Sequence, residues 1–142
     1  EITELELKKY HELVKKHYVL AYRGVLGIAT PETRDTEQFE IGGGSSIRGY
    51  ESAEFKGRYE LYGNIENRFP IEDKFQVVLF YDMGNAWSTW GNIADNLEIY
   101  KGYGVGVRMD TPLGPIRLDY GWPIGNSENK NGKFYFSMGQ MF

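Results

Sequence analysis

The feature that most constrains the fold is an alternation of apolar and polar side chains that begins near residue 58 and continues to the end of the chain. In 58-RYELYGNIENRF-69 the odd positions are mostly apolar, and the even positions carry the charged residues. Successive side chains of a β-strand point to opposite faces, so a period of two predicts strands. The same pattern recurs in four further segments: 75–87, 102–111, 116–122 and 133–142.

Two segments nearer the N-terminus follow the pattern less cleanly. Residues 17–29 place Leu20, Tyr22 and Leu26 opposite Arg23. Residues 2–14 alternate only around Leu5 and Leu7, and a helix is an alternative there because Leu, Glu and Lys favour helices. With both segments counted, the sequence predicts an all-β chain of about seven strands.

The connections between these strands alternate between tight and long. Those near 14–16, 70–74 and 111–115 are tight, whereas 30–57, 88–99 and 125–132 are long and polar. Outer-membrane barrels have short periplasmic turns and longer extracellular loops, and strands of about 9–11 residues cross a bilayer when tilted. Aromatic residues near the strand ends fit the girdles of such a barrel; they are Tyr18, Tyr59, Phe69, Phe75, Trp87, Trp122 and Phe142.

The pattern therefore predicts an antiparallel up-and-down transmembrane β-barrel segment in the bacterial outer membrane, with the C-terminus on the periplasmic side. A soluble β-sandwich or a small ligand-binding barrel is the alternative. It is disfavoured because the polar face mixes Gly, Glu, Asp and Arg, as a barrel lumen does.

Composition excludes several other classes of function. The chain has no cysteine, which excludes disulfides and thiolate metal sites, and its net charge of -4 gives no electrostatic case for nucleic-acid binding. His11 and His17 have no convergent ligands in the pattern, and no Ser/His/Asp set has motif support. We therefore expect no metal site, no cofactor and no catalytic residues, and hence no enzyme.

An odd number of strands is a problem for a membrane barrel. An open sheet leaves backbone groups unpaired in hydrocarbon at several kcal/mol each, and bacterial single-chain barrels normally have an even count. An eighth strand in the long loop or at the N-terminus is one solution. The others are that the chain is the C-terminal part of a larger barrel, or that a second copy closes the barrel.

The long loop 30–57 contains 42-GGGSSIRGY-50. A phosphate-binding loop of the form G-x-x-x-x-G-K-[ST] requires a lysine that opens a helix, and here Arg48 precedes a strand. The glycines permit a reentrant turn. By parity Glu66 and Asp82 face inward, where an arginine fork would bind them, although a solvated loop arginine is the alternative. The glycines of 102-GYGVG-106 also face inward and would leave room for a plug, as would Gly121.

Five motifs now occur in order along the chain. They are 42-GGGSSIRGY-50, an acidic residue at Glu66, 80-FYDMG-84, 111-TPLGPIRLDYG-121 and 134-FYFSMGQMF-142. In this order they resemble the C-terminal half of the BamA/TamA superfamily of outer-membrane insertases and two-partner-secretion transporters, also called the bacterial surface antigen family. The resemblance covers about residues 18–142.

The resemblance implies a 16-stranded barrel preceded by POTRA domains, of which residues 1–142 would be the C-terminal portion. It implies that the loop folds back into the lumen and is locked there, through Arg48, Gly49, Tyr50, Glu66, Asp82 and Gly84. It also implies that residues 133–142 form a C-terminal β-signal strand, with Phe134, Phe136, Met138, Gly139 and Phe142 as its characteristic residues.

The function that the resemblance implies is insertion of outer-membrane proteins by β-strand templating at the barrel seam. The expected partners are outer-membrane lipid, unfolded outer-membrane protein substrates and assembly lipoproteins. The alternatives are a two-partner-secretion or TamA-like polypeptide translocation pore, and a structural barrel that anchors a separate domain such as a patatin-like lipase.

Overall fold

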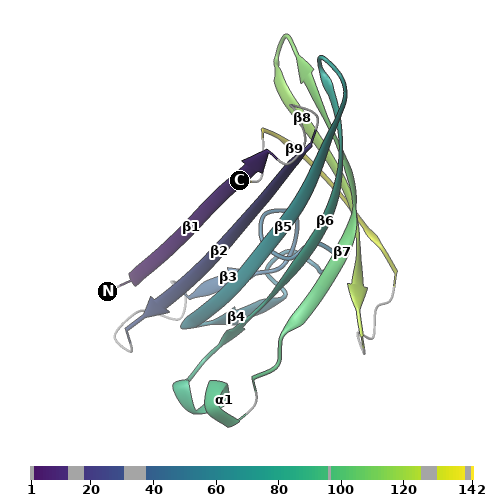
Figure 1. Cartoon of the computed structure of the whole chain (residues 1–142). Helices are drawn as coiled ribbons and strands as arrows, with labels where there is room; N and C mark the ends of the chain where they lie inside the picture. Colours follow the sequence, from purple (N-terminus) through teal and green to yellow (C-terminus); the bar gives the residue numbers. More distant parts are fainter. Residues whose placement is uncertain (1, 13–17, 31–37, 96, 126–130, 140–141) are drawn as a thin grey trace.

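The computed structural model describes residues 2–12, 18–30, 38–95, 97–125, 131–139 and 142. Their main element is a strongly curved antiparallel sheet of seven strands in the order β1-β2-β5-β6-β7-β8-β9 (Figure 1). The strands are β1 (Ile2–Glu12), β2 (Val19–Ala29), β5 (Tyr59–Glu72), β6 (Phe75–Trp87), β7 (Tyr100–Thr111), β8 (Gly114–Ile124) and β9 (Lys133–Met138).

The prediction of seven antiparallel, sequentially paired strands is confirmed, and residues 2–12 form a strand rather than a helix. The long loop carries two short strands, β3 (Phe39–Ile41) and β4 (Phe55–Gly57), which pair with each other in a separate sheet. Within the described residues, the large sheet therefore has no eighth strand, and β1 and β9 are its two edges.

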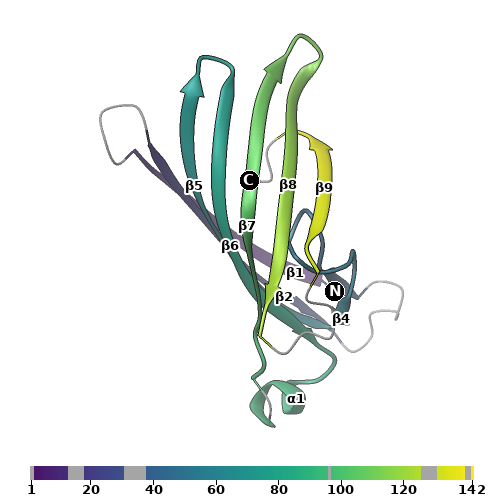
Figure 2. The ribbon, with the colours of Figure 1, turned by 90° about the vertical axis from the view of Figure 1, so that its right-hand side faces the viewer.

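The two ends of the sheet differ as the sequence predicts. The β5–β6 and β7–β8 connections are tight turns at one end (Figure 1). The opposite end carries the β3–β4 loop and a short helix, α1 (Trp90–Asp95) (Figure 2). The predicted tight connection at 14–16 lies outside the described residues.

The sheet has an apolar outer face and a polar concave face. In β2 the side chains of Ala21, Arg23 and Val25 are buried, whereas Tyr22 and Leu26 between and beside them are exposed. Exposed apolar residues continue across the outer face of the neighbouring strands and include Leu61, Ile65, Leu79, Met83, Tyr103, Val105, Tyr120, Phe134 and Phe136. No helix in the described part of the chain is long and apolar enough to cross a membrane.

The interior is mainly charged, and its apolar part is small. One cluster of buried apolar residues comprises Ile41, Ile47 and Tyr50 from the long loop, with Phe55 and Tyr100 packed against it. The rings of Phe55 and Tyr100 stack with centroids 4.2 Å apart. This cluster holds the β3–β4 loop against the inner wall of the sheet.

Two aromatic residues depart from the exposed girdle expected at the strand ends. Trp87 is opposite Tyr59 in the register and keeps the outward parity, but it is buried and lies beside Asn92, Asp95 and Glu98 of α1 and the segment after it. Phe142 was expected to face outward at the end of a strand over 133–142. Instead β9 ends at Met138, Gly139 turns the chain with a φ of 87°, and Phe142 is only 8% exposed.

Candidate functional site

The site begins with a compact turn that points the loop tip into the concave face. Gly42 and Gly43 have φ angles of 121° and 98°, a region that side-chain-bearing residues rarely adopt. The Gly42 amide donates to the Ser46 hydroxyl at 2.8 Å, and the Gly43 amide donates to the Ile47 carbonyl at 3.0 Å. The glycine–serine run is therefore an ordered turn that delivers Arg48.

Arg48 is fully buried and is held by Asp82 on β6. Its Nε donates to Asp82 Oδ2 at 2.7 Å and its Nη2 donates to Asp82 Oδ1 at 2.9 Å, which makes the pair bidentate. The backbone amide of Arg48 donates to the same carboxylate at 2.9 Å. The face of Phe80 lies 3.6 Å from the guanidinium carbon, close enough for a cation–π contact.

Two further carboxylates complete the surroundings of this arginine. Arg48 Nη1 donates to Glu66 Oε1 on β5 at 2.8 Å and to Asp119 Oδ2 on β8 at 3.3 Å. Arg108 on β7 bridges the same two carboxylates, at 2.7 Å to Asp119 and 3.1 Å to Glu66. We call the connected residues the arginine–carboxylate cluster: Arg48, Arg68, Arg108, Arg117, Glu66, Asp82 and Asp119.

The charge of Arg48 is stable in this cluster. Burial by itself lowers the pKa of Arg48, but the charge and hydrogen bonds of Asp82, and then the charges of Glu66 and Asp119, raise it above its ordinary value. The guanidinium therefore remains protonated and bound to its carboxylates at any physiological pH.

Glycines of the wall make room for the tip. A Cβ atom at Gly102 would lie 1.9 Å from the Arg48 carbonyl oxygen, and one at Gly121 would lie 2.8 Å from the Gly49 nitrogen. The prediction that inward glycines leave space for a plug is thus met at these two positions. Gly84 instead lies against β5, since a Cβ there would meet Tyr62 and the Leu61 carbonyl oxygen.

The residues after Arg48 connect the loop to β7 and β9. Tyr50 donates its hydroxyl to the Lys101 carbonyl oxygen at 2.7 Å. The hydroxyl of Tyr135, on β9, accepts from the Gly49 amide at 2.9 Å and donates to the Tyr50 carbonyl oxygen at 2.6 Å. One phenol therefore links the loop tip to the last strand.

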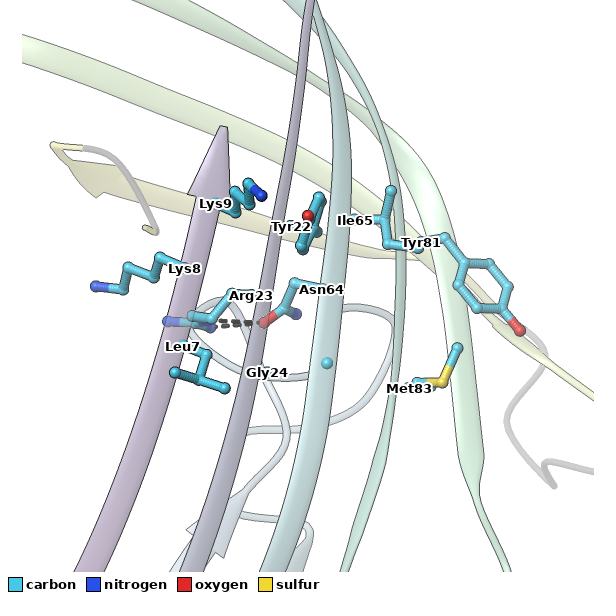
Figure 3. A pocket seen from close by; sticks show the side chains of 11 residues that line it. Leu7, Lys8, Lys9, Tyr22, Arg23, Gly24, Asn64, Ile65, Tyr81 and Met83 are labelled. Carbon is cyan, nitrogen blue, oxygen red and sulfur yellow. Dashed lines mark hydrogen bonds between the residues drawn. The ribbon is translucent and has the colours of Figure 1, made fainter. Parts of the chain in front are cut away.

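A second group holds the turn that precedes the tip. Arg23 on β2 donates to the Ser45 carbonyl oxygen at 2.9 Å. It also donates to Asn64 Oδ1 at 2.8 Å (Figure 3). Asn64 on β5 in turn donates to the Ser46 carbonyl oxygen at 2.5 Å. The loop is thus bound to the inner wall at two places. The arginine–carboxylate cluster holds Arg48, and Arg23 and Asn64 hold the turn that precedes it.

The end of the chain is divided between the two faces. Phe134, Phe136 and Met138 are exposed on the outer face, and the Gly139 amide still donates to the Pro115 carbonyl oxygen at 2.8 Å. Phe142 lies inside, where Arg68 Nη2 donates to its carbonyl oxygen at 3.0 Å.

The structure brings together most of the residues expected in the loop contact, and it adds others. Arg48 meets Asp82 and Glu66 as the parity predicts, and Gly49 and Tyr50 lie beside them. Sequence reasoning did not single out Asp119 and Tyr135, although both have inward parity, nor Asn64, Arg23 and Arg108 as contacts. No group of three or more His, Asp or Glu residues within the described ranges is arranged to hold a metal ion.

Comparison with known proteins identifies the family. The model of the Omp85 superfamily domain matches residues 3–142. The outer membrane protein assembly factor BamA of Nitratidesulfovibrio vulgaris is 31% identical over 97% of this chain, and the chloroplastic outer envelope protein 80 of Arabidopsis thaliana is 35% identical over 72% of it.

A solved structure supports the same fold. The crystal structure of BamA from Haemophilus ducreyi lacking POTRA domains 1-3 matches 95% of this chain with a TM-score of 0.78, at 20% sequence identity. The chain spans 34% of that structure, 20% of the Nitratidesulfovibrio protein and 15% of the Arabidopsis protein. On the match of the domain model over residues 3–142, the chain belongs to the Omp85 superfamily.

Proposed function

We propose that the chain is the C-terminal portion of the barrel of an outer-membrane assembly protein of the BamA type. One observation carries this proposal: a fully buried loop arginine is bound by carboxylates from β5, β6 and β8. This contact, which we call the loop lock, ties the loop to the wall directly beside the terminal strand β9.

The loop lock suggests how strands β5 to β8 support the insertion of another outer-membrane protein. Within the described chain β9 pairs only with β8, over six residues, so its other edge is available for a partner strand. An incoming strand would add to such an edge through main-chain hydrogen bonds. The loop lock would keep β5 to β8 rigid. The other edge of β9 would meanwhile separate from the strand that pairs with it at the barrel seam, and it would template the incoming substrate strand.

The apolar outer face supports a position in the outer-membrane bilayer, with the tight turns and the C-terminal end of β9 on the periplasmic side. The substrates would be unfolded outer-membrane proteins delivered from the periplasm, and assembly lipoproteins would bind the periplasmic side. The name of the Nitratidesulfovibrio relative, outer membrane protein assembly factor, is in keeping with this function.

The test uses the natural polypeptide that carries this sequence, reconstituted in liposomes. Arg48→Lys keeps the charge but loses the bidentate fork, at a cost of about 1.5–3 kcal/mol. We expect it to slow the insertion of a second outer-membrane protein by about tenfold or more, measured as the appearance of its heat-modifiable folded band.

Lys56→Arg is the charge-preserving control, because Lys56 pairs with Glu40 on the exposed surface. Equal insertion rates for the two folded variants would refute the role of the lock. Transport of a polypeptide through the barrel without faster strand insertion would favour the translocation pore.

A further inference from the structure

The outer face has a hollow of about 610 Å³ over β1, β2, β5 and β6. Its floor is a pair of glycines, Gly24 on β2 and Gly63 on β5, which are directly opposite in the strand register. Leu7 lies across from Gly24 on β1, and Met83 lies across from Gly63 on β6. The side chains of Leu7, Tyr22, Ile65, Tyr81 and Met83 are arranged on either side of Gly24 (Figure 3).

The packing of the chain does not account for these glycines. A Cβ atom at Gly24 would have nothing within 4 Å, and one at Gly63 would make only ordinary contacts, the nearest at 3.4 Å. This differs from Gly102 and Gly121, where the loop tip leaves no room for a side chain. Glycine weakens a strand interior and often marks a place where another molecule approaches closely.

The walls of the hollow suit a hydrocarbon chain. Apart from Lys9 at the rim, the outward side chains that line it are apolar or aromatic. Lys8, Arg23 and Asn64 also line it, but they have inward parity and contribute from the opposite side of their strands. Its volume lies within the range of about 300–1,000 Å³ that is usual for small-molecule sites. On the outer face of a membrane sheet, the molecules available to fill it are lipids.

The rim toward the tight-turn end is polar and positive. Lys9 is opposite Tyr22 in the register, on the same outer face, and none of the described residues forms an ion pair with it. The Tyr22 hydroxyl oxygen is 3.1 Å from Nε2 of His11, which follows Lys9 on this face. Lys9 is three residues from the end of β1, so its long side chain can extend to the level of the lipid headgroups.

We propose that this hollow binds one acyl chain of an anionic phospholipid in the leaflet on the tight-turn side, with the lipid phosphate at Lys9 and the Tyr22 hydroxyl. The proposal rests on the bilayer position given under the proposed function, and it does not depend on assembly activity.

The test is native mass spectrometry of the natural polypeptide in detergent, titrated with phosphatidylglycerol and with phosphatidylcholine. We expect one phosphatidylglycerol to bind about fivefold more tightly than phosphatidylcholine, the advantage that one lysine gives. Lys9→Gln should remove this preference, whereas Lys101→Gln, on the outer face of β7, should keep it.

A Cβ atom at Gly24 meets no atom within 4 Å, so Gly24→Leu can place its side chain in the hollow and should abolish binding of both lipids. Gly63→Leu should fill the hollow from β5. Val105→Leu, which enlarges a side chain elsewhere on the outer face, should leave binding unchanged.

Heat-modifiable migration of each variant reports folding, and protease protection in vesicles reports bilayer insertion. A folded, inserted Gly24→Leu or Gly63→Leu protein that retains the lipid would overturn the proposal while the bilayer position stands. Loss of the preference in Lys101→Gln would also overturn it.

Discussion

The burial of Arg48 has an energetic explanation in its partners. A guanidinium removed from water loses several kcal/mol of hydration, and this loss is offset only by well-placed opposite charges. Asp82 supplies a bidentate pair and accepts from the backbone amide as well, while Glu66 and Asp119 accept from the third guanidinium nitrogen, Nη1. If only one of these three carboxylates were present, part of the guanidinium would have no hydrogen-bond acceptor.

The direct pair between Arg48 and Asp82 is testable by a double-mutant cycle on the thermal stability of the barrel. Each of Arg48→Ala and Asp82→Ala leaves a buried charge without its main partner, so each should lower the unfolding free energy by about 3–5 kcal/mol. The double variant should be more stable than the sum predicts, by about 1.5 kcal/mol or more. Arg48→Ala combined with Lys56→Ala is the control, since Lys56 pairs with Glu40 on the exposed surface. Additive losses for Arg48 and Asp82 would exclude the direct pair.

For the strands, the sequence predicts which face of the sheet each side chain occupies. It does not predict which residues of neighbouring strands lie opposite one another. A period of two fixes which face each side chain occupies, so the inward positions of Glu66 and Asp82 follow from the sequence. Which inward residues lie opposite one another depends on the register between neighbouring strands, for example Gly106 opposite Asp119. This register cannot be derived from the pattern of apolar and polar residues. Phe142 was misplaced because the positive φ of Gly139 breaks the period just before it.

The attachment of β9 to the loop depends on the Tyr135 hydroxyl. It both accepts from Gly49 and donates to Tyr50, so Tyr135→Phe removes two hydrogen bonds and keeps the ring. We expect a loss of about 1–3 kcal/mol in stability and faster amide hydrogen exchange in β9 and at Gly49. Tyr103→Phe, on the outer face of β7, should leave that exchange unchanged. Unaltered exchange in the Tyr135 variant would show that the loop and β9 are independent.

The described residues form a curved wall with β1 and β9 as its edge strands. The charged concave face is covered by the β3–β4 loop, and the convex face carries exposed apolar side chains. Within the described chain β1 and β9 each pair with one strand, and an edge strand in hydrocarbon leaves N–H and C=O groups unpaired at several kcal/mol each. Two arrangements would satisfy these edges: further strands that continue the sheet, or a second copy of the chain.

The number of chains in each detergent-solubilised particle shows how the backbone groups at the edges of β1 and β9 are paired. Each unpaired backbone group in hydrocarbon costs several kcal/mol, so residues 1–142 produced alone should associate through their edges. We expect light scattering to find at least two chains in each folded particle. If further strands continue the sheet, a polypeptide that carries them should give one chain per barrel. A stable, folded monomer of residues 1–142 would mean that the two edges are satisfied within the chain itself, and it would refute the inference that further strands or a second copy must complete the barrel.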